Sequence, residues 1–273
     1  MSGSHNKAIA FTKASACGND FLIAAGEDLT DLSVLSQRMC NRHNGIGADG
    51  VEWTFADSGG DGRADVRVRL FNMDGTEAEI SGNGTRCVAA DIVDRTGQKE
   101  VVVRTAAGVK TCRLMERQAA TFEFESEMGS ADVGGQLAIE TMWVRVIGTV
   151  VSMGNPHFVI FVEQFQEGWQ KQAALIQTQP QFPQGTNVEY VIVRGPNEIE
   201  IRLFERGVGE TLSSGTGSCA SAVAAIAAQR VFSPVKVIAP GGAQTVRWEN
   251  NSSRHQVHLR GPATLICRGE FLV

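Results

Sequence analysis

Two short loops in this sequence carry residues that could do chemistry, and both have the same spacing. In each, a glutamate (Glu77 or Glu210) is followed after three residues by Ser-Gly-x-Gly, which begins at Ser81 or Ser214. Glycine lets a ligand approach the first N–H groups of a helix, which have no partner inside the helix and carry partial positive charge. A carboxylate is the ligand that such a loop favours. For one isolated loop, a simple serine N-cap is the better interpretation, but the repetition favours a binding site.

The two loops belong to an internal duplication of the chain. The segment RLFNMDG from Arg69 returns as RLFERGVG from Arg202, at the same offset of 133 that separates the two serines. Three further pairs of segments occur in the same order in both copies, at offsets between 133 and 138. They are Val101 with Val235, Gly18 to Phe21 with Gly154 to His157, and Asp49 to Glu52 with Asn187 to Glu189. Two copies of one domain explain this order.

The elements that would position the loops can be predicted in each copy. Alternating apolar and charged residues in 66–71 predict a half-buried strand, and a helix is expected from about 84 to 95, ended by Gly97. In the second copy, IEIRLF predicts the strand and residues 218–230 the helix. No charged residue occurs from 218 through 228, so we expect this helix to be enclosed on all sides.

We therefore expect two pseudo-symmetric α+β domains, each with strands packed around a buried helix. The polar, glycine-containing stretch at 125–135 predicts the boundary between them. This boundary gives an N-terminal domain over residues 1–126 and a C-terminal domain over residues 127–262.

Composition excludes several classes of protein. The 273 residues are 42% hydrophobic and 20% charged, with a formal charge of −5, which argues against binding to nucleic acid or to an anionic membrane. No apolar run reaches the length of a spanning helix, and the first residues lack the apolar centre of a signal peptide, so we expect a cytoplasmic protein. The six cysteines form no CxxC pair, so they are expected to be free thiols and not zinc ligands.

Two other motifs are set aside on their context. Gly45, Gly47 and Gly50 match the dinucleotide-binding fingerprint, which needs a strand before it and a helix after it. Here the expected order is reversed, with a helix over 32–41 before the motif and a strand over 51–55 after it. His255 and His258 lie three apart in a segment that reads as a strand, where they would face opposite sides. We therefore expect no metal site.

Longer segments resemble successive signatures of the diaminopimelate epimerase family. They are FTKASACGNDF from Phe11, RHNGIGADG from Arg42, NMDGTEAEISGNGTRC from Asn72, VSMGNPH from Val151 and ERGVGETLSSGTGSC from Glu205. The resemblance runs through nearly the whole chain in the family's order. It implies a mixed or antiparallel sheet wrapped around each central helix, a C-terminal strand over 263–273 that returns to the first domain, and a homodimer.

The resemblance also implies an activity without any cofactor. Members of the family invert one α-carbon of diaminopimelate and so interconvert its LL and meso forms, on the route to lysine and to cell-wall cross-links. Such a reaction needs two proton-transfer groups on opposite faces of one carbon, together with positive charge that stabilises the developing carbanion. In the family these two groups are a thiolate and a thiol, and the aligned positions here are Ser81 and Ser214.

The two serines leave several hypotheses open. A hydroxyl is a far weaker acid than a thiol, so each replacement should cost orders of magnitude in rate. The chain is then a divergent member with weak or altered activity, an engineered variant that holds substrate without turnover, or an enzyme in which other groups act. Cys87 and Cys219 lie too far along the helices to replace the serines. A binding-only homologue remains an alternative, as does an isomerase that uses a carboxylate, like the phenazine-biosynthesis enzymes. Matches at the distal substrate positions weigh against the carboxylate enzyme.

The resemblance also assigns roles in binding the substrate, a small molecule. Arg206 would pair with the distal carboxylate, and His157 would orient or tune one of the reacting groups. Gly50 stands where some members carry glutamine. Residues expected to hydrogen-bond the distal ammonium and carboxylate are Asn19, Asn72, Asn155 and Asn187, and those expected to hold the reacting end are Glu205 with the backbone of Gly82, Asn83, Gly215 and Thr216.

Overall fold

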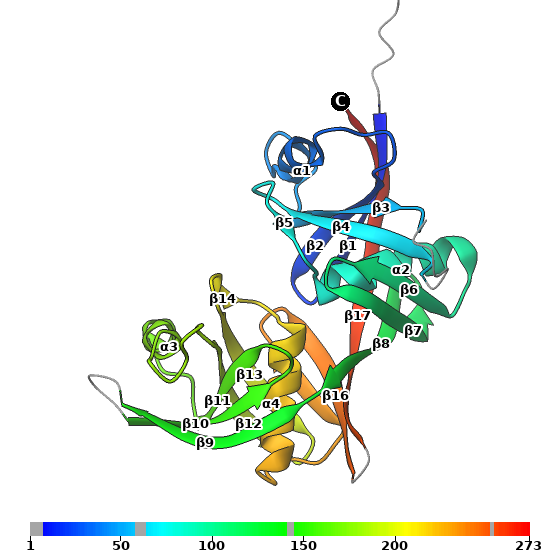
Figure 1. Ribbon diagram of the computed structural model, residues 1–273. Coiled ribbons are helices and arrows are strands. Elements are labelled where there is room, and N and C mark those ends of the chain that lie inside the picture. The colour runs from blue at the N-terminus through cyan, green and yellow to red at the C-terminus, as the bar shows by residue number, and fades with distance from the viewer. Residues whose placement is uncertain (1–7, 58–63, 141–144, 252–253) are drawn as a thin grey trace, which may run out of the picture. The chain divides into compact units, whose positions relative to one another are not determined.

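The structure, a computed structural model, describes residues 8–57, 64–140, 145–251 and 254–273. Much of the N-terminal segment considered for targeting lies outside these ranges. The chain divides into two compact units, which are coloured along the chain in Figure 1: unit 1 comprises Met1–Ser126 with Pro262–Val273, and unit 2 comprises Glu127–Gly261. The division falls inside two long strands, which run from one unit into the other.

The described residues of unit 1 form two helices, and its other elements are strands. Its elements in chain order are β1 (Ala8–Ala16), β2 (Asn19–Ala25), α1 (Leu32–Cys40), β3 (Gly50–Phe55), β4 (Val66–Asn72), β5 (Glu77–Ala78), α2 (Gly82–Thr96), β6 (Glu100–Thr105), β7 (Gly108–Gln118) and β8 (Thr121–Ser130). The end of β17 (Arg254–Leu272) also pairs with β1 in this unit, in an antiparallel ladder that sets Ala8 opposite Leu272.

Unit 2 repeats this order of elements after one extra strand. It comprises β9 (Asp132–Glu140), β10 (Arg145–Ser152), β11 (Pro156–Phe161), α3 (Trp169–Gln177), β12 (Asn187–Gly195), β13 (Glu198–Glu205), β14 (Gly209–Thr211), α4 (Gly215–Ala227), β15 (Val235–Ala239), β16 (Gly242–Asn251) and the start of β17. Figure 1 shows α2 and α4 with strands packed about them, so the expected fold class is confirmed.

Strand pairing gives the exact correspondence between the two repeats. In unit 1, β2 runs parallel to β3 with Phe21 opposite Gly50. In unit 2, β11 runs parallel to β12 with His157 opposite Asn187. Gly50 is therefore the equivalent of Asn187, and the match of Asp49 to Asn187 made from sequence was wrong by one residue. An offset of 137 is correct here, because strand register is fixed by the paired ladder rather than by residue identity.

The two central helices are buried as expected, although their starts were placed too late. In α4 the residues Ser218 to Ala225 are at most 1% exposed, which confirms that this helix is enclosed on all sides. The helix α2 begins two residues before the predicted start, and α4 begins three residues before it and ends at Ala227. Glycine has low helix propensity, but a serine cap and tertiary burial outweigh it at both starts.

Residues 125–135, expected at the domain boundary, lie mostly within β8 and β9 rather than in a loop. Glycine and polar residues are tolerated there because much of this stretch is exposed. The helix α1 before the glycine motif and the strand β3 after it confirm the rejection of a dinucleotide-binding fingerprint. In the described part of the chain, every helix is too short or too polar to cross a membrane.

Candidate functional site

Ser81 forms the cap of α2 in unit 1. Its backbone is extended, and its Oγ accepts a hydrogen bond of 3.1 Å from the N–H of Gly84. Gly82 and Asn83 begin the helix, so their N–H groups lack acceptors within it. Gly82 is exposed, and a Cβ placed on it would meet no atom within 4 Å. The helix start is therefore open to a ligand at the position that the sequence indicated.

Asn19 lies directly beside this loop. Its Oδ1 accepts a 2.8 Å hydrogen bond from Asn83, and its Nδ2 donates to Asp49 at 3.1 Å. Arg86, which is 2% exposed, donates to the Oδ1 of Asn83 from within α2. Ser81, Asn19 and Asn83 thus form one cluster in unit 1, called the unit 1 half-site below. Sequence reasoning missed Asp49 and Arg86 as the groups that fix its two asparagines.

Asn72 has a local role in this structure. Its Nδ2 donates to the hydroxyl of Thr76 at 3.0 Å, and its backbone N–H donates to the carbonyl of Thr76. Both contacts lie in the turn between β4 and β5, where the side chain of Asn72 is exposed. A turn residue is a common fate of asparagine, and a substrate contact by Asn72 remains a prediction.

Ser214 caps α4 in unit 2 in the same way but has an additional partner. Its Oγ accepts from the N–H of Gly217 at 3.3 Å and donates to the Oε2 of Glu205 at 3.2 Å. Gly215 and Thr216 begin the helix. The carboxyl group can therefore receive the serine proton, a contact that the equivalent position in unit 1, Asn72, does not provide.

The remaining predicted residues of unit 2 join this cluster through β11 and β12. His157 is fully buried, and its two ring nitrogens contact Glu189 at 2.7 Å and Asn155 at 3.0 Å. Asn187 donates to the carbonyl of Pro156 and accepts from the backbone N–H of Arg206. These residues, together with Ser214 and Glu205, are called the unit 2 half-site below.

Arg206 is exposed, and its guanidinium donates to the carbonyl of Gln184 at 3.0 Å. Its aliphatic part packs against Gly185, where a Cβ would lie 3.1 Å from the Arg206 Cδ. Because glycine has no side chain, Gly185 can adopt its φ of +73° and leaves room for the arginine. A free, planar guanidinium edge at this position suits a carboxylate.

Sequence reasoning assigned no function to Glu52 and Glu189, which the structure places beneath the two capped turns. Both are buried, at 2% and 1% exposure. Burial raises the pKa of Glu52 to about 8, and burial also raises the pKa of Glu189 although His157 opposes that effect. The available signal was a glutamate inside an otherwise apolar strand, in VEWTF and in VEYVIV.

Neither neighbouring thiol can take over from a serine. Cys87 and Cys219 are 0% exposed within α2 and α4, and burial raises the pKa of Cys87. A buried, protonated thiol is a poor nucleophile and a poor base. Each half-site thus has a helix start whose first N–H groups lack acceptors within the helix, a hydroxyl at its edge and polar side chains that are fixed by buried partners.

Comparison with known proteins identifies the family of the chain. The family model described as diaminopimelate epimerase matches residues 11–133 and 149–266. The chain belongs to the diaminopimelate epimerase family. As a member of this family it is an isomerase of the epimerase type.

Individual relatives of the diaminopimelate epimerase family match over almost their whole length. The diaminopimelate epimerase of Pelotomaculum thermopropionicum is 36% identical, over 96% of this chain and 98% of its own. That of Desulfitobacterium hafniense is 34% identical, over 95% of this chain and 97% of its own.

Solved structures at lower identity share the fold. A phenazine biosynthesis protein of the PhzF family from Bacillus anthracis is 14% identical with a TM-score of 0.71, covering 98% of this chain and all of that one. A hydroxyproline epimerase from Agrobacterium vitis is 17% identical with a TM-score of 0.66, covering 96% of this chain and 90% of that one. At such identities the likeness extends to the fold alone.

Proposed function

We propose that this chain is a cofactor-independent epimerase that interconverts LL- and meso-diaminopimelate, with Ser81 and Ser214 at the positions of the family's catalytic cysteines. One observation carries the proposal. Two equivalent helices in two repeated units each begin at a serine whose Oγ accepts the N–H of the third residue after it. A reaction that adds a proton to one face of a carbon and removes one from the other needs two proton-transfer groups, and the two serine hydroxyls form such a pair.

In this proposal residues of both half-sites take part in binding diaminopimelate. The N–H groups of Gly82 and Asn83, and of Gly215 and Thr216, which have no acceptor within their helices, bind the carboxylate at the reacting carbon and stabilise its carbanion. The distal ammonium and carboxylate are bound by Arg206 and by the four asparagines Asn19, Asn72, Asn155 and Asn187. Family resemblance extends the proposal to a homodimer.

The hydroxyls supply the proton transfers with help from unit 2. Ser214 donates to Glu205, so removal of the α-proton by Ser214 can be coupled to passage of its own proton to that carboxylate. His157 lies on β11, beside β12, and its ring contacts Glu189 on that strand; in this proposal it supports the proton transfer. Because an unaided alkoxide is nearly absent at neutral pH, we expect turnover to be slow.

Deuterium wash-in tests the activity. The protein is incubated with LL-diaminopimelate in heavy water, and α-deuteration is followed by mass spectrometry. We expect exchange above the uncatalysed background, and we expect the double variant S81C/S214C to be faster by roughly 10²–10⁴-fold because thiols titrate near neutrality. The matched control is S81A/S214A, which keeps both loops but should show no exchange. If S81C/S214C exchanged no faster than S81A/S214A, the mechanism would be wrong.

Serine hydroxyls stand at both positions where the family has catalytic cysteines. This favours a second candidate, a homologue that binds diaminopimelate without turnover. Calorimetry distinguishes it from the enzyme. Binding of diaminopimelate without α-deuteration, in the wild-type protein, would support a binding protein. Restored exchange in S81C/S214C would then show that only the acidity of the two groups had been lost.

A further inference from the structure

Each unit buries one glutamate beneath the first turn of its central helix. Glu52 on β3 is paired with Leu70, and Glu189 on β12 is paired with the equivalent Leu203. A Cβ on Gly84 would lie 1.7 Å from the Oε1 of Glu52, and a Cβ on Gly217 would lie 3.1 Å from the Oε1 of Glu189. Each carboxyl group therefore packs closely against a glycine, Gly84 or Gly217, whose N–H donates a hydrogen bond to the capping serine.

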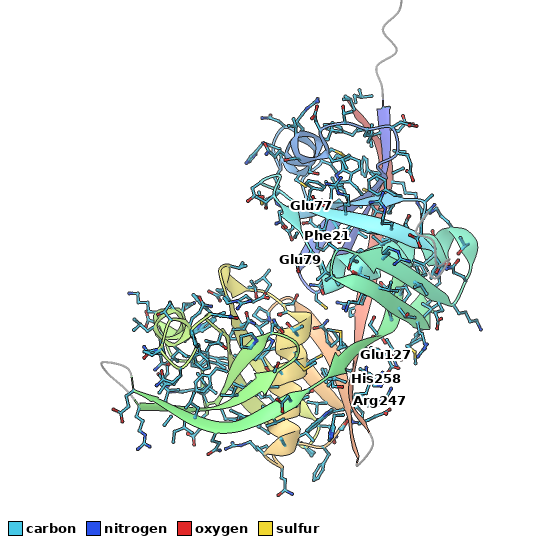
Figure 2. All side chains as sticks on the ribbon, in the orientation of Figure 1. Phe21, Glu77, Glu79, Glu127, Arg247 and His258 are labelled. Atoms are coloured by element: carbon cyan, nitrogen blue, oxygen red, sulfur yellow. The ribbon has the colours of Figure 1, made fainter. Side chains whose placement is uncertain are left out.

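The two glutamates differ in what compensates their burial. The Oε1 of Glu189 contacts the Nδ1 of His157 at 2.7 Å, while its Oε2 has no hydrogen-bond partner among the described residues. The equivalent of His157 in unit 1 is Phe21, labelled on unit 1 in Figure 2, whose ring offers no hydrogen bond. Among the described residues, the Oε1 of Glu52 has no hydrogen-bond partner. An uncompensated buried carboxylate is costly, so the uncharged acid is the favoured form.

The surroundings of Glu52 contain few charged or titratable groups. Its paired neighbours in the sheet, Ile23 on β2 and Leu70 on β4, are apolar. From α2 come the buried thiol of Cys87 and the guanidinium of Arg86. Arg86 donates to Asn83, to the carbonyl of Pro262 and to the sulfur of Cys17. With desolvation as the cause, the pKa of Glu52 lies at about 8, so the group is mostly uncharged at neutral pH.

An ionised Glu52 would oppose the proposed task of the helix start. The N–H groups at the beginning of α2 attract an anion because they carry partial positive charge and have no carbonyl acceptor within the helix. A negative charge packed against Gly84 would lie on the inner side of that same turn and would offset this attraction. The effect is strong because the carboxyl group is 2% exposed and water screens it little.

We propose that Glu52 is a positioning residue of the unit 1 half-site, which must be uncharged for the start of α2 to hold the substrate carboxylate. The inference rests on the proposed function, in which that carboxylate binds there. Substrate binding then favours the protonated form of Glu52, so binding takes up a fraction of a proton at this residue that grows with pH toward one as Glu52 ionises in the free protein. By reciprocal linkage the affinity falls as Glu52 ionises, up to about tenfold per pH unit.

Calorimetry of diaminopimelate binding between pH 7 and 9 tests this. Titrations at each pH in two buffers of different ionisation enthalpy give the number of protons taken up. We expect the wild-type protein to lose affinity more steeply than E52Q and to take up more protons at pH 8.5. Comparing the two proteins removes the titration of the ligand's own amines, which is common to both. E52L, which also lacks the titratable group, should behave as E52Q does and covers the case that the buried amide impairs folding.

The matched control is E79Q. Glu79 is an exposed carboxyl two residues before Ser81 and is also labelled in Figure 2, so this variant removes a nearby charge that water screens. It should keep the wild-type proton uptake. If wild type, E52Q and E52L bound with the same pH dependence, Glu52 would have no such role while the proposed function stood. If none of them bound diaminopimelate at any pH, the proposed function itself would fail.

Discussion

The hydroxyls of Ser81 and Ser214 have different surroundings although their backbones are equivalent. Ser214 donates to the carboxylate of Glu205, whereas the equivalent of that glutamate in unit 1 is Asn72, which bonds within its own turn. A hydroxyl with a carboxylate acceptor gives up its proton more readily than one without. At the residue scale, Ser214 is therefore the better base of the pair in the proposed mechanism: it removes the α-proton in one direction while Ser81 supplies a proton, and the two roles exchange in the reverse reaction.

Glu52 should make unit 1 less stable as the pH rises. Burial raises its pKa to about 8, while an unfolded glutamate titrates near about 4.3. Between these values the folded chain holds a proton that the unfolded chain has released, so a higher pH favours unfolding. We expect a loss of about 1.4 kcal/mol of unfolding free energy per pH unit between about pH 5 and 7 from this group.

Urea unfolding of wild type and E52Q at pH 5, 6 and 7 measures this loss. The variant should show a shallower decline of unfolding free energy with pH, whatever its absolute stability. Parallel curves for the two proteins would mean that Glu52 ionises normally in the folded state.

At the scale of elements, the last glycine of each Ser-Gly-x-Gly loop decides how closely helix and sheet approach. G84A would place a Cβ 1.7 Å from a carboxyl oxygen of Glu52, and we expect a cost of about 1–3 kcal/mol from overpacking. E52A removes the colliding atoms, so G84A should cost less in the E52A background than in wild type.

Thermal or urea unfolding of wild type, G84A, E52A and the double variant G84A/E52A gives the coupling free energy between the two positions. G82A is the control, because its Cβ would meet nothing within 4 Å and alanine favours a helix by about 0.5–1 kcal/mol. Equal costs of G84A in both backgrounds would contradict the close contact between Glu52 and the helix start.

The sequence predicts these elements well where the pattern is local. Serine before a helix, glycine after it, and the lack of charge in 218–228 predicted α2 and α4 and the burial of α4. The register between repeats was wrong by one residue at Asn187, since only the ladder with His157 defines it. The repeat already aligns Phe21 with His157, but the contact of His157 with Glu189 on the next strand, which Glu52 lacks, was not predictable from sequence.

At the scale of the whole molecule, the C-terminal strand completes the first unit. Residues from Pro262 onward belong to unit 1, where Ala263 is 0% exposed and Thr264 bonds with Thr121. Deleting 262–273 should expose one side of β1 and destabilise the core around α2, while leaving all residues of unit 2 in place.

Hydrogen exchange read by mass spectrometry can follow the two cores separately. We expect the truncated chain to lose protection in α2 by at least about tenfold, equal to about 1.4 kcal/mol, and to retain it in α4. Deletion of Val273 alone, which lies outside β17, serves as the control. Uniform loss of protection in both helices would show that the units do not unfold separately.

The ladder between β1 and β17 sets Ala8 opposite Leu272, so the first and last strands of the chain end side by side in unit 1. A short linker could join them, and the ring could be reopened in the tight β12–β13 turn at Pro196–Asn197 without removing a ladder. Such a circularly permuted chain would begin and end in unit 2 yet preserve both capped helices. The linear order of the strands is therefore one of several gene arrangements compatible with this fold.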